Sequence, residues 1–205
     1  MSEMAPRKSR LGASLIEIVV SIAVFSLVLV SLAKIMNAGY EQYWIASGSL
    51  EVQKAALTGT QLMVAELTQS NMDSVEIVDP LPRPDKTVPA FDDIVFALPD
   101  DLNGERHYSN RGVVEWWSFV SYYTQEVNGV RSLLRSSMAS PSPTTEVPVP
   151  SVLGITSATV QASAAPRMIM TGVGNFDLEQ REDLVRIELT GIFQQRGTFS
   201  ITIRN

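Results

Sequence analysis

A single apolar segment near the N-terminus constrains this chain more than any other feature. Residues Ala13–Ala33 hold sixteen apolar side chains, four serines and one charged side chain, Glu17. A helix of this length rises about 30 Å, which matches the hydrocarbon core of a lipid bilayer. No second stretch of this kind follows in the sequence, so we expect one membrane pass at most.

The charges that flank the apolar segment predict its orientation. Arg7, Lys8 and Arg10 precede it, whereas Lys34 stands alone on the far side. Positive residues stay in the cytoplasm when a helix inserts into a membrane. We therefore expect a cytoplasmic N-terminus and a C-terminal part on the other side of the membrane.

The overall composition excludes several classes of function. The 205 residues carry 16 Lys and Arg against 22 Asp and Glu, with no Cys and one His. The net charge of -6 argues against general binding to nucleic-acid phosphates. The lack of Cys excludes a disulfide framework, thiol catalysis and Cys-ligated metal sites. Outside the apolar segment, the apolar share is ordinary for a soluble domain.

Three interpretations of the apolar segment compete. A cleaved secretory signal would fit the basic start and the small residues at Ser31 and Ala33, but the apolar run is longer than signals usually are. A plain uncleaved anchor leaves Glu17 unexplained, at a cost of about 2–3 kcal/mol if it lay deep in the bilayer. The third interpretation accounts for Glu17.

The segment Gly12–Glu17 (Gly-Ala-Ser-Leu-Ile-Glu) resembles the processing site of type IV pilins and type II secretion pseudopilins. The resemblance spans about residues 7–36. It implies that a prepilin peptidase cuts the basic leader Met1–Gly12 on the cytoplasmic side, that Ala13 becomes the methylated N-terminus, and that the apolar helix is retained. The family often has an aromatic residue after the cut, where this chain has Ala13.

The spacing of Ala13 and Glu17 has a physical meaning of its own. A cut after Gly12 creates an ammonium group one helical turn from the Glu17 carboxylate, and pairing offsets part of the cost of placing both at an apolar boundary. The resemblance implies that Glu17 faces the N-terminus of a neighbouring subunit and sets the register between helices. Neutralisation within one chain, with no role in assembly, is the alternative.

The sequence predicts that the helix continues beyond the membrane segment. No Pro occurs between Ala13 and Val78, so the helix is expected to reach about Ser70, with a kink at Ser47–Ser49. We divide it into a membrane part, 13–36, and an amphipathic periplasmic part, 37–70.

The periplasmic part carries an apolar stripe of Leu50, Leu57 and Val64, spaced seven apart, with Leu67 beside them. We expect this stripe to pack on the chain's own C-terminal sheet. A groove for a partner helix is the alternative.

Residues 71–205 change to a period of two, which predicts an antiparallel β domain and an α+β fold class. Asn128-Gly129 predicts a type I′ hairpin turn. Proline-rich segments at 79–89 and 140–151 predict loops, the second exposed and mobile, and residues 152–165 are ambiguous. The predicted strands are Ile94–Leu98, Val113–Gln125, Val130–Arg135, Met168–Met170, Asn175–Leu178, and a final hairpin of Val185–Thr190 and Phe199–Arg204.

The β domain also resembles, less specifically, J-type minor pseudopilins and W-type minor pilins over about residues 113–205. The resemblance is carried by the aromatic run Trp116–Tyr123, by Leu133–Arg135 and by Gly174–Phe176. Many major pilins carry a Pro in the membrane helix, so the resemblance implies that a chain without one, such as this one, is a minor subunit. The resemblance implies a position at a filament tip and a role in starting assembly.

The sequence shows no catalytic constellation. The one His, His107, lies in a polar stretch and is expected to be an exposed loop residue. The segment Asp100–Glu105 fails the EF-hand pattern, because Pro99 and Asn110 fall on ligand positions. We therefore expect no enzyme activity, metal or other cofactor. Calcium, which some pilin-like subunits bind in other loops, is unsupported here.

These observations predict a structural subunit of a type IV pilus or type II secretion pseudopilus. It would be held in the bacterial inner membrane and then incorporated into a periplasmic or extracellular filament. The expected partners are the prepilin peptidase and methyltransferase, other pilin or pseudopilin subunits, the inner-membrane assembly platform and membrane lipid, and no nucleic acid. A membrane-anchored periplasmic binding module or enzyme is the alternative.

Overall fold

The computed structural model describes residues 14–78, 89–181, 184–193 and 197–204. The chain divides into two compact units, Met1–Ala46 and Ser47–Asn205, which are described separately here. The helix α1, Leu15–Gln69, contributes its first part to one unit and its last part to the other.

The helix α1 is continuous from Leu15 to Gln69. Ser47–Ser49, where the sequence predicts a kink, are helical like their neighbours. It ends at Gln69, next to the predicted end at Ser70. The backbone N–H of Ser70 makes the last bonds of the helix, to the carbonyl oxygens of Glu66 and Leu67 at 3.1 and 3.2 Å. Asn71 then caps the short 3₁₀ helix η1, Met72–Ser74, by accepting a hydrogen bond from the backbone of Asp73.

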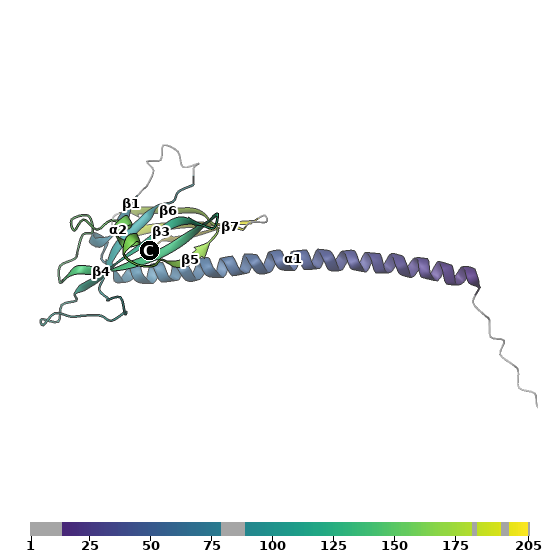
Figure 1. The fold of residues 1–205 in the computed structure, drawn as a ribbon, viewed down its shortest axis with the longest axis horizontal. Coiled ribbons are helices and arrows are strands. Elements are labelled where there is room, and N and C mark those ends of the chain that lie inside the picture. The colour runs from purple at the N-terminus through teal and green to yellow at the C-terminus, as the bar shows by residue number, and fades with distance from the viewer. Residues whose placement is uncertain (1–13, 79–88, 182–183, 194–196, 205) are drawn as a thin grey trace, which may run out of the picture. The chain divides into compact units, whose positions relative to one another are not determined.

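The second unit contains two antiparallel sheets, which confirms the α+β class (Figure 1). The larger sheet is a meander in which each strand pairs with the next along the chain. Its strands are β1 (Glu76–Val78), β2 (Asp93–Leu98), β3 (Trp116–Val127), β4 (Val130–Thr144) and β5 (Arg167–Thr171). The helix α2, Ser157–Ser163, precedes β5. The smaller sheet consists of β6 (Val173–Arg181), β7 (Leu184–Phe193) and β8 (Gly197–Arg204).

A short segment before β2 joins the two sheets. The backbone N–H of Asp92 donates to the carbonyl oxygen of Phe176 at 2.9 Å, and the N–H of Phe176 donates to Ala90 at 2.7 Å. The Asp92 carboxylate, 2% exposed, accepts the N–H of Leu178 at 2.7 Å. These bonds join β6 of the smaller sheet to the residues that lead into β2 of the larger sheet.

The hairpin between β3 and β4 turns where the sequence predicts. Asn128 and Gly129 have φ angles of 53° and 77°, the left-handed pair that a type I′ turn requires. The C-terminal hairpin of β7 and β8 is likewise confirmed, with Leu189 opposite Ile201. Val185, Ile187 and Leu189 are buried as predicted, whereas the side chains of β8 lie outside the described residues.

The predicted loop at 140–151 is partly wrong. The strand β4 continues to Thr144, and Pro148 and Pro150 are buried rather than exposed. Proline is tolerated here because β5 pairs with β4 only at Ser132–Arg135, which leaves the later part of β4 with one unpaired side in the described sheet. Of the other predicted loop, 79–88 lies outside the described residues.

The core is divided by the larger sheet, and β2 is buried on both faces. Ile94, Phe96 and Leu98 pack in a cluster with α1 and the smaller sheet, as their alternation predicts. Val95 and Ala97 point to the opposite face, where they pack with Phe119 and with Ile155 and Val160 around α2. The ambiguous residues 152–165 thus provide a cover for the second face.

The predicted apolar stripe on α1 is wrong in its first half. Leu50 and Leu57 are 65% and 52% exposed, although Leu67 is buried. The buried line consists instead of Ala56, Gly59, Thr60, Met63 and Leu67. Three of these places hold small residues, Ala56, Gly59 and Thr60. The helix approaches β5 closely at Gly59, where a Cβ would lie 2.3 Å from the Cγ2 of Ile169.

A half-buried carboxyl group on β2, that of Asp93, gives the stability a specific pH dependence. Ser157 Oγ and Gln161 Nε2, both on α2, donate to the same oxygen of Asp93 at 3.0 and 3.1 Å. Burial raises the pKa of Asp93 in spite of these bonds. The folded state therefore holds a proton that the unfolded state releases, so this group's contribution to stability falls as the pH rises from 3.8 through the folded pKa.

We expect Asp93→Asn to raise the midpoint of thermal unfolding at pH 7 and to change it much less near pH 3.5. Asparagine keeps an acceptor for both α2 donors without the buried charge. Thermal melts of the full chain in detergent across this pH range measure the difference. Glu126→Gln removes an exposed carboxylate on β3 and serves as control. A difference between Asp93→Asn and the native chain that is constant with pH would contradict the assignment.

Candidate functional site

The N-terminal end of α1 is closed by a reciprocal capping box. The backbone N–H of Glu17 donates to Ser14 Oγ at 3.3 Å, and the backbone N–H of Ser14 donates to Glu17 Oε2 at 3.2 Å. Each side chain thus satisfies a backbone donor that the first helical turn leaves free. The Glu17 carboxylate also stabilises the positive end of the helix dipole.

The structure describes one of the residues that the sequence predicts as functional. Glu17 lies at the start of α1, whereas Gly12, Ala13 and the leader cations Arg7, Lys8 and Arg10 lie outside the described residues. The capping role of Glu17 was missed, although Ser followed three residues later by Glu is the sequence signature of a capping box. Glu17 therefore has a partner within its own chain before any neighbour is considered.

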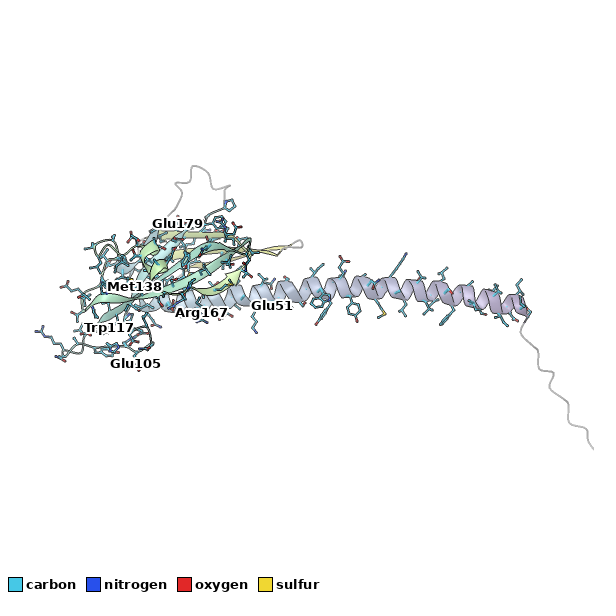
Figure 2. All side chains as sticks on the ribbon, viewed as in Figure 1. Glu51, Glu105, Trp117, Met138, Arg167 and Glu179 are labelled. Carbon is cyan, nitrogen blue, oxygen red and sulfur yellow. The ribbon has the colours of Figure 1, made fainter. Side chains whose placement is uncertain are left out.

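The first part of α1 presents an apolar surface that the rest of the described chain does not cover. Every residue from Ser14 to Trp44 is exposed, and large apolar side chains dominate this stretch (Figure 2). By length and composition, α1 is the one helix in the described ranges that is long and apolar enough to cross a membrane. A membrane anchor and a signal sequence both fit this finding.

Three serines in this apolar stretch are satisfied locally. Ser21, Ser26 and Ser31 donate their hydroxyl hydrogens to the carbonyl oxygens four residues earlier, at 2.8, 2.7 and 2.9 Å. A hydroxyl bonded in this way adds no unsatisfied polar group to an apolar surface. They therefore require no partner on a neighbouring helix.

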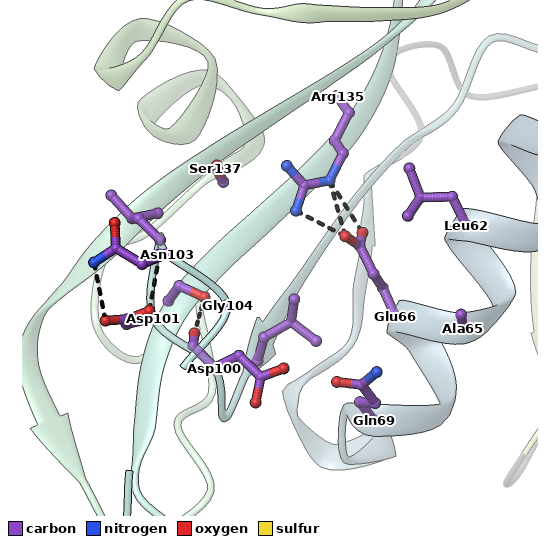
Figure 3. A pocket seen from close by; sticks show the side chains of 13 residues that line it. Leu62, Ala65, Glu66, Gln69, Asp100, Asp101, Asn103, Gly104, Arg135 and Ser137 are labelled. Carbon is purple, nitrogen blue, oxygen red and sulfur yellow. Dashed lines mark hydrogen bonds and ion pairs between the residues drawn. The ribbon is translucent and has the colours of Figure 1, made fainter. Parts of the chain in front are cut away.

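In the second unit, a partly buried ionic cluster attaches α1 to the larger sheet (Figure 3). Arg135 on β4 donates to both carboxylate oxygens of Glu66 on α1, at 2.8 Å from Nη2 and at 3.0 and 3.1 Å from Nε. Tyr122 on β3 donates its hydroxyl hydrogen to Glu66 Oε2 at 2.6 Å. These two side chains come from neighbouring strands and converge on one helical residue.

The ionic cluster has a fixed protonation pattern. Burial, followed by the negative charge of Glu66, raises the pKa of Tyr122, so the phenol keeps its proton. Burial alone would lower the pKa of Arg135, but the hydrogen bonds and charge of Glu66 outweigh it and the net pKa is raised. Tyr122 therefore keeps its proton and Arg135 its positive charge at neutral pH, which suits a structural contact better than proton transfer.

A polar pocket of about 360 Å³ adjoins this cluster. Glu66 and Arg135 line one side, and the loop around Asp101 and Asn103 lines the other (Figure 3). The Asp101 carboxylate accepts the backbone N–H groups of Asn103 and Glu105 at 2.8 and 2.9 Å. The bond from Glu105 is the largest cause that lowers the pKa of Asp101, to about 2, so this carboxylate is ionised at neutral pH.

The loop after β2 also brings His107 to Asp101. His107 Nε2 lies 3.2 Å from Asp101 Oδ2, and the imidazole ring packs 4.3 Å, centroid to centroid, from the indole of Trp117. His107 is therefore half-buried and held on two sides, which corrects the prediction of an exposed loop residue. A carboxylate oxygen of Glu105 joins Asp101 and His107 in a group whose ligand atoms all lie within 4.8 Å of one another.

Comparison of the chain with protein-family models, curated proteins and solved structures finds no match.

Proposed function

We propose that this chain is a minor pilin-like structural subunit of a type IV pilus or a type II secretion pseudopilus. The observation that carries the proposal is the first part of α1, Leu15–Trp44, which is helical, rich in large apolar side chains and exposed. Large apolar surface is unfavourable in water. Lipid before assembly and neighbouring helices after it are environments that would remove this surface from water.

The proposal assigns a role to each part of the chain. The leader, 1–12, is removed after Gly12, and Ala13 becomes the methylated N-terminus. Residues 13–36 lie in the inner membrane and later in the filament core, while 37–70 form the periplasmic part of the helix. The β domain, 71–205, projects from the filament and contacts other subunits, in keeping with a position near the tip.

Glu17 is the residue through which we expect subunits to recognise one another. The capping box shows that its carboxylate already accepts one backbone hydrogen bond, from Ser14. A carboxylate has about four lone-pair sites, so one such bond leaves room for the ammonium group of a neighbouring N-terminus. The pair would fix the axial position of helices that are otherwise uniformly apolar.

We expect Glu17→Val to permit cleavage of the leader but to reduce incorporation into filaments about tenfold, because a lost charge pair of roughly 1.4 kcal/mol changes an equilibrium by that factor. Quantitative mass spectrometry of purified filaments against the membrane fraction measures incorporation.

Glu17→Gln separates the two roles of this side chain. Glutamine retains the acceptor for the Ser14 backbone but lacks the charge, and Ser14→Ala weakens the cap while leaving the charge in place. The proposal predicts that Glu17→Gln assembles as poorly as Glu17→Val and that Ser14→Ala assembles almost normally. Normal assembly of Glu17→Gln would reduce the role of Glu17 to helix capping.

A further inference from the structure

We propose that Asp101, Glu105 and His107 form a binding site for a divalent transition-metal ion of the zinc class, with one imidazole nitrogen and two carboxylate oxygens as ligands. The proposal concerns the loop between β2 and β3 and does not depend on the function proposed for the N-terminal helix.

Two of the three ligand atoms already have the separation that a zinc ion requires. Zinc is bound tetrahedrally at about 2.0–2.1 Å by nitrogen and oxygen, which places neighbouring ligand atoms about 3.3 Å apart. Asp101 Oδ2 and His107 Nε2 are 3.2 Å apart. The third ligand atom, from Glu105, lies within 4.8 Å of both and belongs to an exposed side chain.

The local fold fixes the positions of the Asp101 and His107 side chains. An antiparallel bridge between Asp100 and Arg106 makes a narrow hairpin, closed by Gly104 with φ at 82°. Backbone N–H groups of the hairpin donate to Asp101 Oδ1, while Asp101 Oδ2 lies 3.2 Å from His107 Nε2 and accepts the side-chain amide of Asn103 at 3.3 Å. The indole of Trp117 fixes the plane of the imidazole from the other side.

The charges of the hairpin favour a cation at this place. Asp101 and Glu105 bring two carboxylates together, and Arg106, the cation that follows Glu105 in the sequence, is already held by Asp100 at 2.9 Å and by Gln69 at 3.1 Å. The Glu105 carboxylate has no hydrogen bond or ion pair within the described part of the chain. A divalent ion would neutralise both carboxylates and provide the missing partner.

The ligand set selects among metals. Calcium takes six to eight oxygen ligands, so three protein ligands that include a nitrogen are a poor calcium site. Imidazole with carboxylates suits zinc, and three protein ligands leave a fourth position for water. Zinc is therefore expected to bind where calcium does not.

Isothermal titration of zinc chloride into the full chain in detergent tests the site. The chain must carry no histidine tag, because its single His is the proposed ligand. We expect one equivalent of zinc to bind, at least tenfold more weakly to His107→Gln and to Glu105→Gln, with no displacement by excess calcium. Glu126→Gln, an exposed carboxylate elsewhere on the same sheet, is the matched control and should bind zinc like the native chain.

The single imidazole also gives a direct spectroscopic test that does not depend on variants. Nitrogen-detected NMR of the imidazole side chain reports one residue, and zinc should shift its Nε2 signal in the native chain and in Glu126→Gln. Equal zinc affinity in the native chain and His107→Gln, an unshifted Nε2 signal at saturating zinc, or displacement by calcium would each overturn the proposal.

Discussion

Gly12→Arg is expected to leave the twelve-residue leader on every copy of the chain. If the chain is processed like a prepilin, the peptidase must bring its catalytic groups to the backbone between Gly12 and Ala13. Glycine has no Cβ and allows such a close approach, which a long cationic side chain obstructs. Mass spectrometry of the membrane fraction, after co-expression with a prepilin peptidase, measures the fraction cut.

The native chain identifies the competing interpretations in the same experiment. An N-terminus at methylated Ala13 supports prepilin processing, one at Lys34 indicates a secretory signal, and an intact Met1 or Ser2 indicates a plain anchor. Ala13→Ser is the matched control, because it changes the other side of the same bond and should be cut normally. A mature N-terminus at Ala13 in Gly12→Arg would contradict the assignment of this site.

The parts of the fold that the sequence predicts correctly depend on local signals. The end of α1 near Ser70, the turn at Asn128-Gly129 and the alternation of Val185–Leu189 each follow from a few neighbouring residues. The backbone geometry of a helix, a type I′ turn or a half-buried strand is specified within such a window.

The predictions that are wrong concern features determined by packing between segments that are far apart in the sequence. Leu50 and Leu57 form the more hydrophobic line on α1, but the buried line is the one that contains Ala56, Gly59 and Thr60, because these small residues allow the helix to approach the sheet more closely. The prolines near the end of β4 predict a loop from the sequence. They are compatible with a strand because β5 pairs only with Ser132–Arg135 and leaves one side of the later part of β4 unpaired. Neither fact can be inferred from a single segment.

The candidate sites likewise differ in whether neighbouring residues or long-range contacts form them. The capping box at Ser14 and Glu17 was readable from the sequence, and recognising it changes Glu17 from an unexplained charge to a group with a defined local bond. The approach of Asp101, Glu105 and His107 depends on the hairpin around Gly104, and the sequence alone did not predict it. The contact between Glu66 and Arg135 joins residues 69 positions apart.

Glu66→Ala is expected to destabilise the second unit strongly. It removes the partner of Arg135, whose side chain is only 20% exposed, and leaves the Tyr122 hydroxyl without an acceptor. Breaking a buried ion pair by removing one partner costs about 3 kcal/mol. For a unit of this size that corresponds to a fall of roughly 6–12 °C in the unfolding midpoint.

Thermal unfolding of the full chain in detergent, followed by near-ultraviolet circular dichroism, measures this fall. Glu51→Ala makes the same substitution at an exposed position of the same helix and should move the midpoint by no more than about 2 °C. Equal midpoints for the two variants would show that the cluster contributes little to the attachment of α1.

A double variant distinguishes the net value of the ion pair from the cost of breaking it. Glu66→Met combined with Arg135→Met removes both charges and retains similar volume, and replacing a whole buried pair in this way is often neutral. We therefore expect the double variant to recover the part of the midpoint that Glu66→Ala loses through the unpaired Arg135 charge, whereas the Tyr122 hydroxyl lacks its acceptor in both variants. A double variant as unstable as Glu66→Ala would instead mean that the pair itself stabilises the unit. Recovery would mean that the ion pair adds little net stability. Its main role would then be to fix the position of α1 on the sheet, because methionines fill the same space but favour no single position.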